Sequence, residues 1–209
     1  MPNKRRSLIP FLLGATALFT MLSSRKRESM TGFGPPFRLD SYTSHNGTTG
    51  SNTLVIGADF HQPRGKGTTK HYALDFRAKQ GTPLYALGDG VIQAIHDPST
   101  LCGQGVKLRM KGQDGHTYIT NYCHMSTVSV KKGESVQKGQ IIGTTGGTPG
   151  TYGAGNSFGP HLHLELWRQK PGGGFGLIDP LPHIDWRPFA LKVNHTPGIA
   201  RPDIIDASS

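Results

Sequence analysis

The chain has 209 residues, enough for one domain or one and a half, because a single core commonly takes about 100 to 200 residues. Its 29 glycines and 15 prolines would interrupt every long helix, so a helical bundle or coiled coil is excluded and short strands joined by turns are favoured. The formal net charge of +10 comes without a nucleic-acid motif, so we expect no nucleic-acid partner and a general attraction to anionic polymers.

Residues 1–29 are predicted to be a signal peptide or membrane anchor built on one N-terminal hydrophobic helix. A basic cluster at residues 4–6 precedes an apolar run over residues 8–22, and a second basic cluster follows at residues 25–27. The apolar run is short for a membrane span, which needs about 17 to 25 residues, and is typical of a signal peptide. It ends without a clear small-x-small cleavage site, so cleavage and retention both stay open.

Residues 30–53 are rich in Gly, Pro, Ser and Thr without any period, and we expect a linker or an irregular arm there. Short apolar segments then recur between turn signals. They predict a mainly β domain over residues 54–190, an antiparallel β-sandwich or a partly open barrel of short strands. Within it, residues 106–110 and 117–123 are expected to pair as a hairpin. Residues 191–209 are interpreted as a C-terminal tail.

Two cysteines, Cys102 and Cys123, are compatible with an exported protein that forms one disulfide. The predicted hairpin would bring the two near each other. Two unpaired, small hydrophobic side chains are an equal alternative, because spacing alone cannot establish a bridge.

A run of alternating polar and apolar residues near the end of the domain indicates a metal site. In a strand, His161, His163 and Glu165 share one face while the three leucines between and after them enter the core. Neighbours on such a face lie about 6.5 Å apart at their Cα atoms. One imidazole can therefore bind an ion while the other stands over an open coordination position.

Three earlier residues complete the candidate set. His71 and Asp75 fall on a common face in a strand and could supply one imidazole and one carboxylate, and His124 ends the predicted hairpin strand. Two neutral imidazoles and one carboxylate leave Zn²⁺ a fourth position for water, and such an ion lowers the pKa of that water towards ~7. Two cysteines are too few for a Cys-rich structural zinc site, and the H-E-x-x-H helix motif is absent.

In this order along the chain, the motifs resemble those of the lysostaphin-type (LytM-like) zinc endopeptidases, a family of peptidoglycan hydrolases. Their pattern is H-x-x-x-D followed much later by H-x-H. The resemblance covers roughly residues 59–184 and includes connecting segments at residues 80–91, 122–126, 136–143 and 159–163. It implies a LytM-like fold of the duplicated-hybrid-motif type.

The resemblance also implies a role for each candidate residue. His71, Asp75 and His163 would bind one zinc ion per chain. His124 and His161 would form the catalytic pair, which polarises the attacking water or steadies the tetrahedral oxyanion. One histidine of the H-x-H pair must stay free in any case, since a fourth protein ligand would close a catalytic site.

Other positions near the motifs carry weaker expectations. Glu165 either orients a ligand imidazole or is a solvated carboxylate at a strand end, and the second interpretation is favoured. Ala73 stands where the family usually has Gly and is expected to narrow the groove floor, and Cys123 replaces a residue that is usually aromatic or small. The Gly-rich segments 146–159 and 172–176 are expected to form groove walls. Four aromatic side chains could line the groove or pack in the core: Tyr72, Tyr118, Tyr122 and Trp167.

These features predict a zinc-dependent endopeptidase that hydrolyses a peptide bond in the stem or cross-bridge of bacterial peptidoglycan. The alternatives are a non-catalytic peptidoglycan-binding or scaffolding module of the same fold, and a metallopeptidase that acts on protein. The N-terminal segment predicts a membrane-anchored or exported protein of the cell envelope that remodels the wall, or alternatively a protein of a phage virion membrane that penetrates it. The bond cleaved and the oligomeric state are not predicted.

Overall fold

A computed structural model describes residues 29–64 and 69–193 of the chain. The predicted N-terminal hydrophobic helix and most of the predicted C-terminal tail therefore lie outside the described residues. Within residues 29–64 and 69–193 we find no helical segment with the length and hydropathy of a membrane span.

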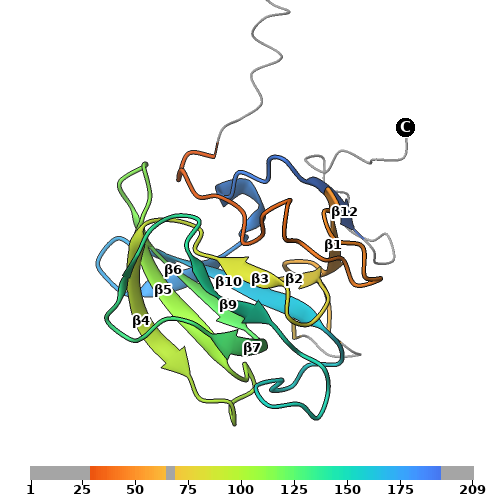
Figure 1. Cartoon of the computed structure of the whole chain (residues 1–209). Coiled ribbons are helices and arrows are strands. Elements are labelled where there is room, and N and C mark those ends of the chain that lie inside the picture. The colour runs from red at the N-terminus through yellow and green to blue at the C-terminus, as the bar shows by residue number, and fades with distance from the viewer. Residues whose placement is uncertain (1–28, 65–68, 194–209) are drawn as a thin grey trace, which may run out of the picture.

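The described chain is mainly β and forms two sheets (Figure 1). The large sheet has nine strands in the order β12-β1-β2-β10-β6-β5-β4-β8, with β11 paired to β10 at its side. The small sheet has three, in the order β3-β9-β7. The mainly β prediction is thus confirmed, and the short strands form two packed sheets.

The bounds of the large sheet are β1 (Thr53–Ala58), β2 (Leu74–Arg77), β4 (Gly90–His96), β5 (Gly105–Lys111), β6 (Thr117–Cys123), β8 (Ser135–Val136), β10 (His161–Gln169), β11 (Phe175–Ile178) and β12 (Ala190–Val193). Those of the small sheet are β3 (Pro83–Tyr85), β7 (Met125–Val128) and β9 (Ile141–Thr145). A short 3₁₀ helix, η1 (Leu181–His183), precedes the last strand.

The core lies between the two sheets and is filled by the inward face of each strand. Leu74 and Leu108 from the large sheet and Leu84 and Ile142 from the small sheet are fully buried in one cluster. In Figure 1 the small sheet covers one face of the large sheet. Alternation along each strand then leaves the other face of β2, β6 and β10 free to carry polar side chains.

The predicted hairpin is confirmed. β5 and β6 pair antiparallel with Met110 opposite Tyr118 and Lys111 opposite Thr117. The connection closes with the backbone N–H of Gly112 donating to the carbonyl of His116 at 2.9 Å. Both strands continue towards the two cysteines at the opposite end of the hairpin.

Residues 30–53 are irregular, yet they are part of the folded body. Phe37 and Tyr42 are fully buried, and their ring centroids lie 5.0 Å apart. Phe33 packs edge-on against Tyr118 of β6 at 5.1 Å, and Tyr42 Oη donates to the carbonyl of Arg77 at 2.7 Å. The composition of this segment prevents regular strands but leaves three aromatic anchors, so the core extends upstream of Leu54.

The end of the described chain also differs from the sequence-based expectation. Residues 191–193, which the sequence places at the start of a tail, belong to β12, which pairs parallel with β1, Leu191 opposite Leu54. Leu191 and Val193 pack against the core, and Phe189 is buried. The four-residue alternation is too short to stand out among the prolines around it.

Candidate metal centre

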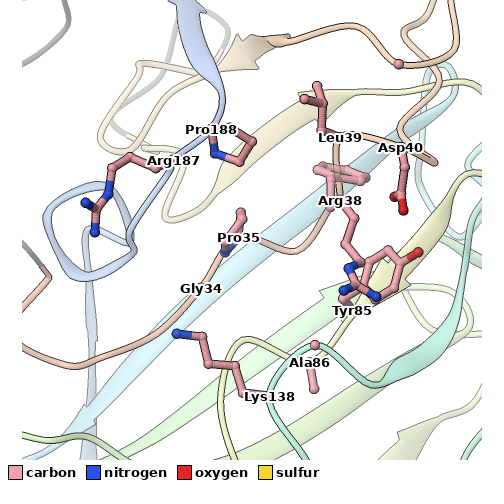
Figure 2. A pocket seen from close by; sticks show the side chains of 13 residues that line it. Gly34, Pro35, Arg38, Leu39, Asp40, Tyr85, Ala86, Lys138, Arg187 and Pro188 are labelled. Atoms are coloured by element: carbon pink, nitrogen blue, oxygen red, sulfur yellow. The ribbon is translucent and has the colours of Figure 1, made fainter.

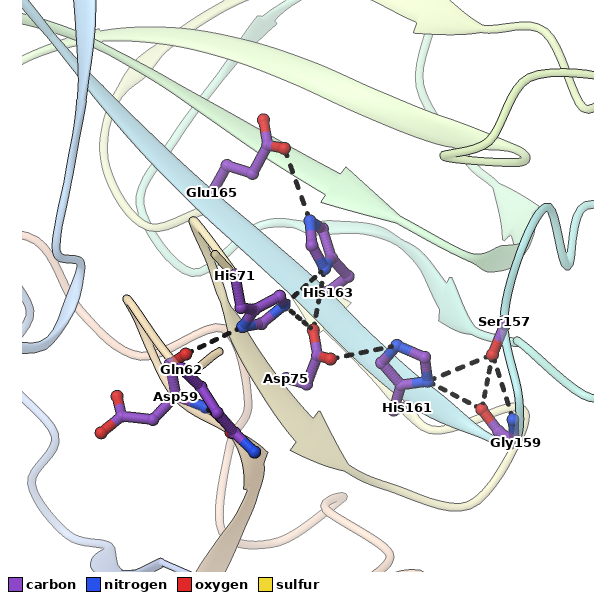
Figure 3. Close-up of polar contacts among 9 residues, drawn as sticks. All are labelled: Asp59, Gln62, His71, Asp75, Ser157, Gly159, His161, His163 and Glu165. Atoms are coloured by element: carbon purple, nitrogen blue, oxygen red, sulfur yellow. Dashed lines mark hydrogen bonds and ion pairs between the residues drawn. The ribbon is translucent and has the colours of Figure 1, made fainter. Parts of the chain in front are cut away.

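β10 carries the H-x-H motif and lies between β2 and β6 (Figure 3). Leu162, Leu164 and Leu166 are fully buried, so the expected alternation is observed and His161 and His163 share the opposite face. Residues directly opposite on neighbouring strands have Cβ atoms about 4.5 to 5.5 Å apart. The sheet register therefore decides which side chains meet the two imidazoles.

Three of the predicted site residues converge on one point. His163 lies opposite Asp75 of β2, and its Nδ1 is 2.8 Å from Asp75 Oδ1. His71 Nε2 is 3.1 Å from the same carboxylate oxygen and 3.3 Å from His163 Nδ1. One donor atom from each of the three side chains thus faces a common centre.

The orientation of the His71 ring is fixed by a hydrogen bond on the side away from the candidate metal centre. Its Nδ1 donates a hydrogen bond of 3.0 Å to the carbonyl of Asp59, and the imidazole is buried. A ring whose Nδ1 carries the proton leaves the Nε2 lone pair available. The backbone of the segment before β2 therefore fixes the tautomer that a metal ligand needs.

His161 and His124 stand beside this centre. His161 Nδ1 donates to the carbonyl of Gly159 at 2.7 Å, which leaves Nε2 on the side of Asp75, 3.8 Å from Oδ2. The ring centroids of His124 and His161 are 4.8 Å apart, and those of His124 and His163 are 5.7 Å apart. The structure thus brings all five predicted residues together, while the division into ligands and catalytic groups stays a prediction.

His124 adopts a backbone conformation that is unusual for a residue with a side chain. Its φ is +59°, in the left-handed region, at the point where the chain leaves β6 and enters β7. This conformation costs about 1 to 2 kcal/mol for a non-glycine residue. The turn aims the imidazole towards His161, and its Nδ1 is buried with no hydrogen-bond partner among the described residues.

Burial and the neighbouring charges set the protonation of these groups. Burial alone would raise the pKa of Asp75, but the hydrogen bond from His163 and the charges of His163 and His161 outweigh it and hold the pKa well below its usual value. Burial lowers the pKa of His124 to about 4, and the charges of His161 and His163 act in the same direction. At neutral pH the site therefore offers a carboxylate in the centre and a neutral imidazole at its edge.

Glu165 differs from the favoured expectation of a solvated strand-end carboxylate. It lies within β10, where it accepts hydrogen bonds from Asn121 Nδ2 at 2.6 Å and Trp167 Nε1 at 3.0 Å. Its Oε1 is 3.4 Å from His163 Nε2. Burial would raise the pKa of Glu165, but these hydrogen bonds, from His163 first, lower it to about 2. The carboxylate is therefore placed to orient the ring of His163.

The three converging side chains fit a zinc ion. Zinc binds His nitrogen at about 2.0 to 2.1 Å and carboxylate oxygen at about 2.0 to 2.2 Å, so tetrahedral ligands lie roughly 3.3 Å apart. The donor atoms of His71, Asp75 and His163 are 2.8 to 3.3 Å apart. His124, His161 and His163 form a second group that could hold an ion. Of these two groups, the first is the one that includes a carboxylate.

A cleft of about 620 Å³ opens over the site. Three exposed apolar side chains stand in its wall: Tyr72 (44% exposed), Leu101 (79%) and Phe158 (92%). Of the two Gly-rich segments expected to form walls, the first contributes Asn156 and Phe158, whereas 172–176 does not line the cleft.

Burial and the disulfide decide the remaining expectations about the cleft. Ala73 is fully buried and does not line the cleft, so it does not narrow the groove floor. Tyr118 and Tyr122 are fully buried packing residues. Cys123 does line the cleft, and it forms a disulfide with Cys102, with Cα atoms 4.9 Å apart. The alternative of two unpaired cysteines is therefore wrong.

A second cleft, of about 590 Å³, lies beside the irregular arm and carries no comparable chemistry (Figure 2). The guanidinium of Arg38 lies over the ring of Tyr85, 5.4 Å from its centroid. Lys138 Nζ donates to the carbonyl of Gly32 at 2.7 Å, and Arg187 pairs with the carboxylate of Asp185. The cationic groups around this cleft are thus held by other groups of the protein.

Residues 69–172 match the model of peptidase family M23, and the chain belongs to that family. All five predicted site residues lie inside the matched stretch. The peptidoglycan DD-endopeptidase ShyA of Vibrio cholerae is 40% identical over 104 residues, which cover 50% of this chain and 22% of ShyA. The glycyl-glycine endopeptidase ALE-1 of Staphylococcus capitis is 37% identical over 103 residues, which cover 49% of this chain and 26% of ALE-1.

The fold agrees with this assignment. A solved structure of the antimicrobial peptidase lysostaphin from Staphylococcus simulans superposes with a TM-score of 0.51 at 27% identity, covering 73% of this chain and 52% of that one. The chain spans about a quarter or less of the length of the two curated relatives named above.

Sequence reasoning missed the residues that hold the site in place. The backbone carbonyls of Asp59 and Gly159 hold the rings of His71 and His161. Because these contacts use the backbone, the residue types at the two positions do not predict them. Asn121 binds Glu165 from the neighbouring strand, and His96 Nε2 lies 3.3 Å from Asn121 Oδ1. Only the register of β4, β5, β6 and β10 brings these groups together.

Proposed function

We propose that this chain is a zinc-dependent endopeptidase that hydrolyses a peptide bond of bacterial peptidoglycan. The observation that carries the proposal is the convergence of His71 Nε2, Asp75 Oδ1 and His163 Nδ1 within 2.8 to 3.3 Å of one another. Two further imidazoles stand beside them in an open cleft. Membership in peptidase family M23 and relatives named as peptidoglycan endopeptidases support the same activity.

His71, Asp75 and His163 would hold the zinc ion. Zinc bound by two imidazoles and one carboxylate supplies Lewis-acid polarisation of a carbonyl and a water of lowered pKa. The carboxylate of Asp75 stays ionised at neutral pH, so the centre carries the negative charge that a cation needs. The cleft above the three side chains leaves room for water and substrate.

His161 and His124 would handle protons and developing charge. Because His161 Nδ1 donates to the carbonyl of Gly159, its Nε2 is the nitrogen that faces the reacting groups and can take up a proton. His124 is neutral at neutral pH and buried on one side, which suits a fixed hydrogen-bonding group beside an oxyanion. Both rings are therefore positioned by the fold before substrate arrives.

The bond that is cleaved is left to experiment. The name of ShyA specifies a DD-endopeptidase and that of ALE-1 a glycyl-glycine endopeptidase, so relatives of similar identity are named for different bonds. The full chain should be incubated with purified walls of both cross-link types, with and without a chelator. Mass spectrometry of the released fragments then identifies the bond.

The same experiment separates the alternatives once zinc is added back after the chelator and protein substrates are tested beside the walls. Release of new peptide ends that stops with chelator and returns with zinc supports the enzyme. Binding to walls without release in both conditions would instead favour a binding or scaffolding module. Cleavage of protein substrates with no release from walls would favour a protein-directed metallopeptidase.

We also propose a location at the cell envelope, with the N-terminal segment as export signal or anchor. The support is the basic–apolar–basic pattern of residues 4–27. A phage virion membrane remains the alternative setting for the same pattern. Detection of the full-length chain in the membrane fraction of the producing cells, or in purified virions, decides between them, and a purely cytosolic chain would contradict both.

A further inference from the structure

The loop between β4 and β5 forms a wall of the cleft next to His124. Its residues Leu101 and Cys102 line the cleft, and Leu101 is largely exposed. The ladder between β5 and β6 ends at the pair of Val106 and Tyr122 and does not reach His124. Something other than sheet pairing must hold this wall against the end of β6.

Two backbone hydrogen bonds and the disulfide supply that connection. The N–H of His124 donates to the carbonyl of Cys102 at 2.8 Å, and the N–H of Met125 donates to the carbonyl of Gln104 at 2.8 Å. Cys102 is bonded to Cys123, the residue immediately before His124. The covalent bridge therefore holds the acceptor carbonyl and the donor N–H of His124 in register.

The wall is continued by a second loop that interlocks with the first. The N–H of Gln104 donates to the carbonyl of Gly153 at 3.0 Å, and that of Asn156 donates to the carbonyl of Leu101 at 3.0 Å. Gly103 packs so tightly that a Cβ there would lie 2.1 Å from the carbonyl oxygen of Gly153. Release of Cys102 would therefore loosen both loops.

The metal-binding group is held by different contacts. His71 is fixed by the carbonyl of Asp59, and His163 is placed by the β2–β10 ladder and by Glu165. His163 lies opposite Cys123 in the register of β6 and β10, but that ladder runs on for five further residue pairs beyond it. Loss of the disulfide is thus expected to disturb His124 and to spare the three ligands.

We propose that the Cys102–Cys123 disulfide is a positioning element for His124, so that turnover requires the oxidised chain whereas zinc binding does not. This inference rests on the proposed endopeptidase activity. Left-handed backbone at His124 is a conformation that its surroundings must impose, and the bridge is the covalent part of those surroundings. Reduction breaks the S–S bond, takes up two electrons and two protons, and leaves two thiols, the electrons coming from an added phosphine reductant.

The test compares the oxidised full chain, the same chain reduced with a phosphine, and the double variant Cys102→Ala/Cys123→Ala. We expect kcat to fall by about 10- to 100-fold in both altered forms, the loss that a misplaced catalytic group causes. KM should change little, and the zinc content per chain should be unchanged. Reoxidation of the reduced chain should restore kcat.

Two controls separate positioning from a general loss of stability. Leu54→Ala, in the core away from the cleft, should lower the melting temperature and leave kcat unchanged at temperatures where it is folded. In a His124→Ala background, removal of the disulfide should cost no further kcat, since the bridge acts through that residue. An additive loss there, or zinc lost in parallel with activity, would overturn the inference.

A readout independent of activity keeps the inference separate from the proposed function. Amide hydrogen exchange of residues 123–126 should be slow in the oxidised chain and fast in the reduced chain, while residues 71–77 and 161–165 stay protected in both. If amide exchange at residues 123–126 is the same in the oxidised and reduced chains, the inference is wrong even if the enzyme is active. If the oxidised, zinc-loaded chain releases no fragments from walls, the proposed function is wrong, whatever the exchange result.

Discussion

His163 and Asp75 lie directly opposite each other on β10 and β2, and His163 Nδ1 is 2.8 Å from Asp75 Oδ1. The residues are 88 positions apart in the chain, yet the antiparallel register of these two strands makes them neighbours. Any change that shifts that register by one residue would send one of the two side chains to the opposite face. The candidate metal site thus depends on the pairing of two strands.

Substitution of the two histidines of the H-x-H motif should have separable effects. His163→Ala removes a donor from the converging group and should abolish both zinc binding and hydrolysis. His161→Ala removes a ring whose Nε2 faces the site from outside that group, so it should lose hydrolysis and keep most of the zinc. Zinc content by mass spectrometry and wall hydrolysis measure both, and full hydrolysis with zinc in both variants would contradict the assignment.

Glu165→Gln should weaken zinc binding without abolishing it. The carboxylate is held by Asn121 and Trp167 and faces His163 Nε2, and loss of such an outer partner typically costs about 10- to 100-fold in metal affinity. Competition with a chelator measures the affinity. Asp114→Asn is the matched control, because the Asp114 carboxylate accepts a hydrogen bond from Tyr118 and lies outside the site. This variant should leave the zinc affinity unchanged. Equal affinities in both variants would show that Glu165 does not act on the ligand.

Zinc uptake by the chelator-treated chain should depend on pH. Burial alone would lower the pKa of His163, but hydrogen bonds to Asp75 and Glu165 outweigh it and raise the pKa to about 9. Below that pH the proton competes with zinc for the ring, and above it the competition ends. The apparent affinity should therefore rise about tenfold per pH unit for this one proton between pH 7 and about 9, then level off. Titration at several pH values measures this, and a flat profile would contradict it.

Phe158 should contribute to substrate binding. It is 92% exposed and stands in the wall of the cleft, so its removal costs the fold little and removes apolar surface that a bound peptide would cover. Phe158→Ala is expected to raise KM by about 3- to 10-fold with a smaller change in kcat. Tyr152→Ala, 70% exposed and outside the cleft lining, is the control and should leave KM unchanged. Equal KM values would exclude Phe158 from substrate contact.

Phe37→Ala tests whether the irregular arm belongs to the domain. The ring is fully buried against Tyr42 and Phe76, and truncation of a buried Phe typically costs about 3 to 5 kcal/mol. Chemical denaturation should show that loss in the free energy of unfolding. Met30→Ala, 79% exposed, should change it little. A Phe37 variant as stable as the wild type would make the segment a linker after all.

The sequence by itself determined the class of fold and the faces of the strands. Gly and Pro density excluded long helices, and the alternation from His161 to Leu166 placed two imidazoles and Glu165 on one face because a strand has a period of two residues. The resemblance of the motifs predicted that His71, Asp75 and His124 would join them. The strand face expected to carry both His71 and Asp75 is not observed, because β2 begins at Leu74 and His71 lies before it. The structure brings these five together.

Only the tertiary structure decided which side chains are neighbours across strands and in the core. The disulfide, the partners of Glu165, and the burial of Phe37 and Tyr42 in an arm without periodicity depend on strand order and register. The physical reason is that periodicity is a local property of the chain, whereas a cross-strand neighbour is set by the packing of the whole core. The alternation that puts Glu165 on a strand face is the same whether its carboxylate lies in water or beside His163 Nε2, so the sequence could not distinguish the two.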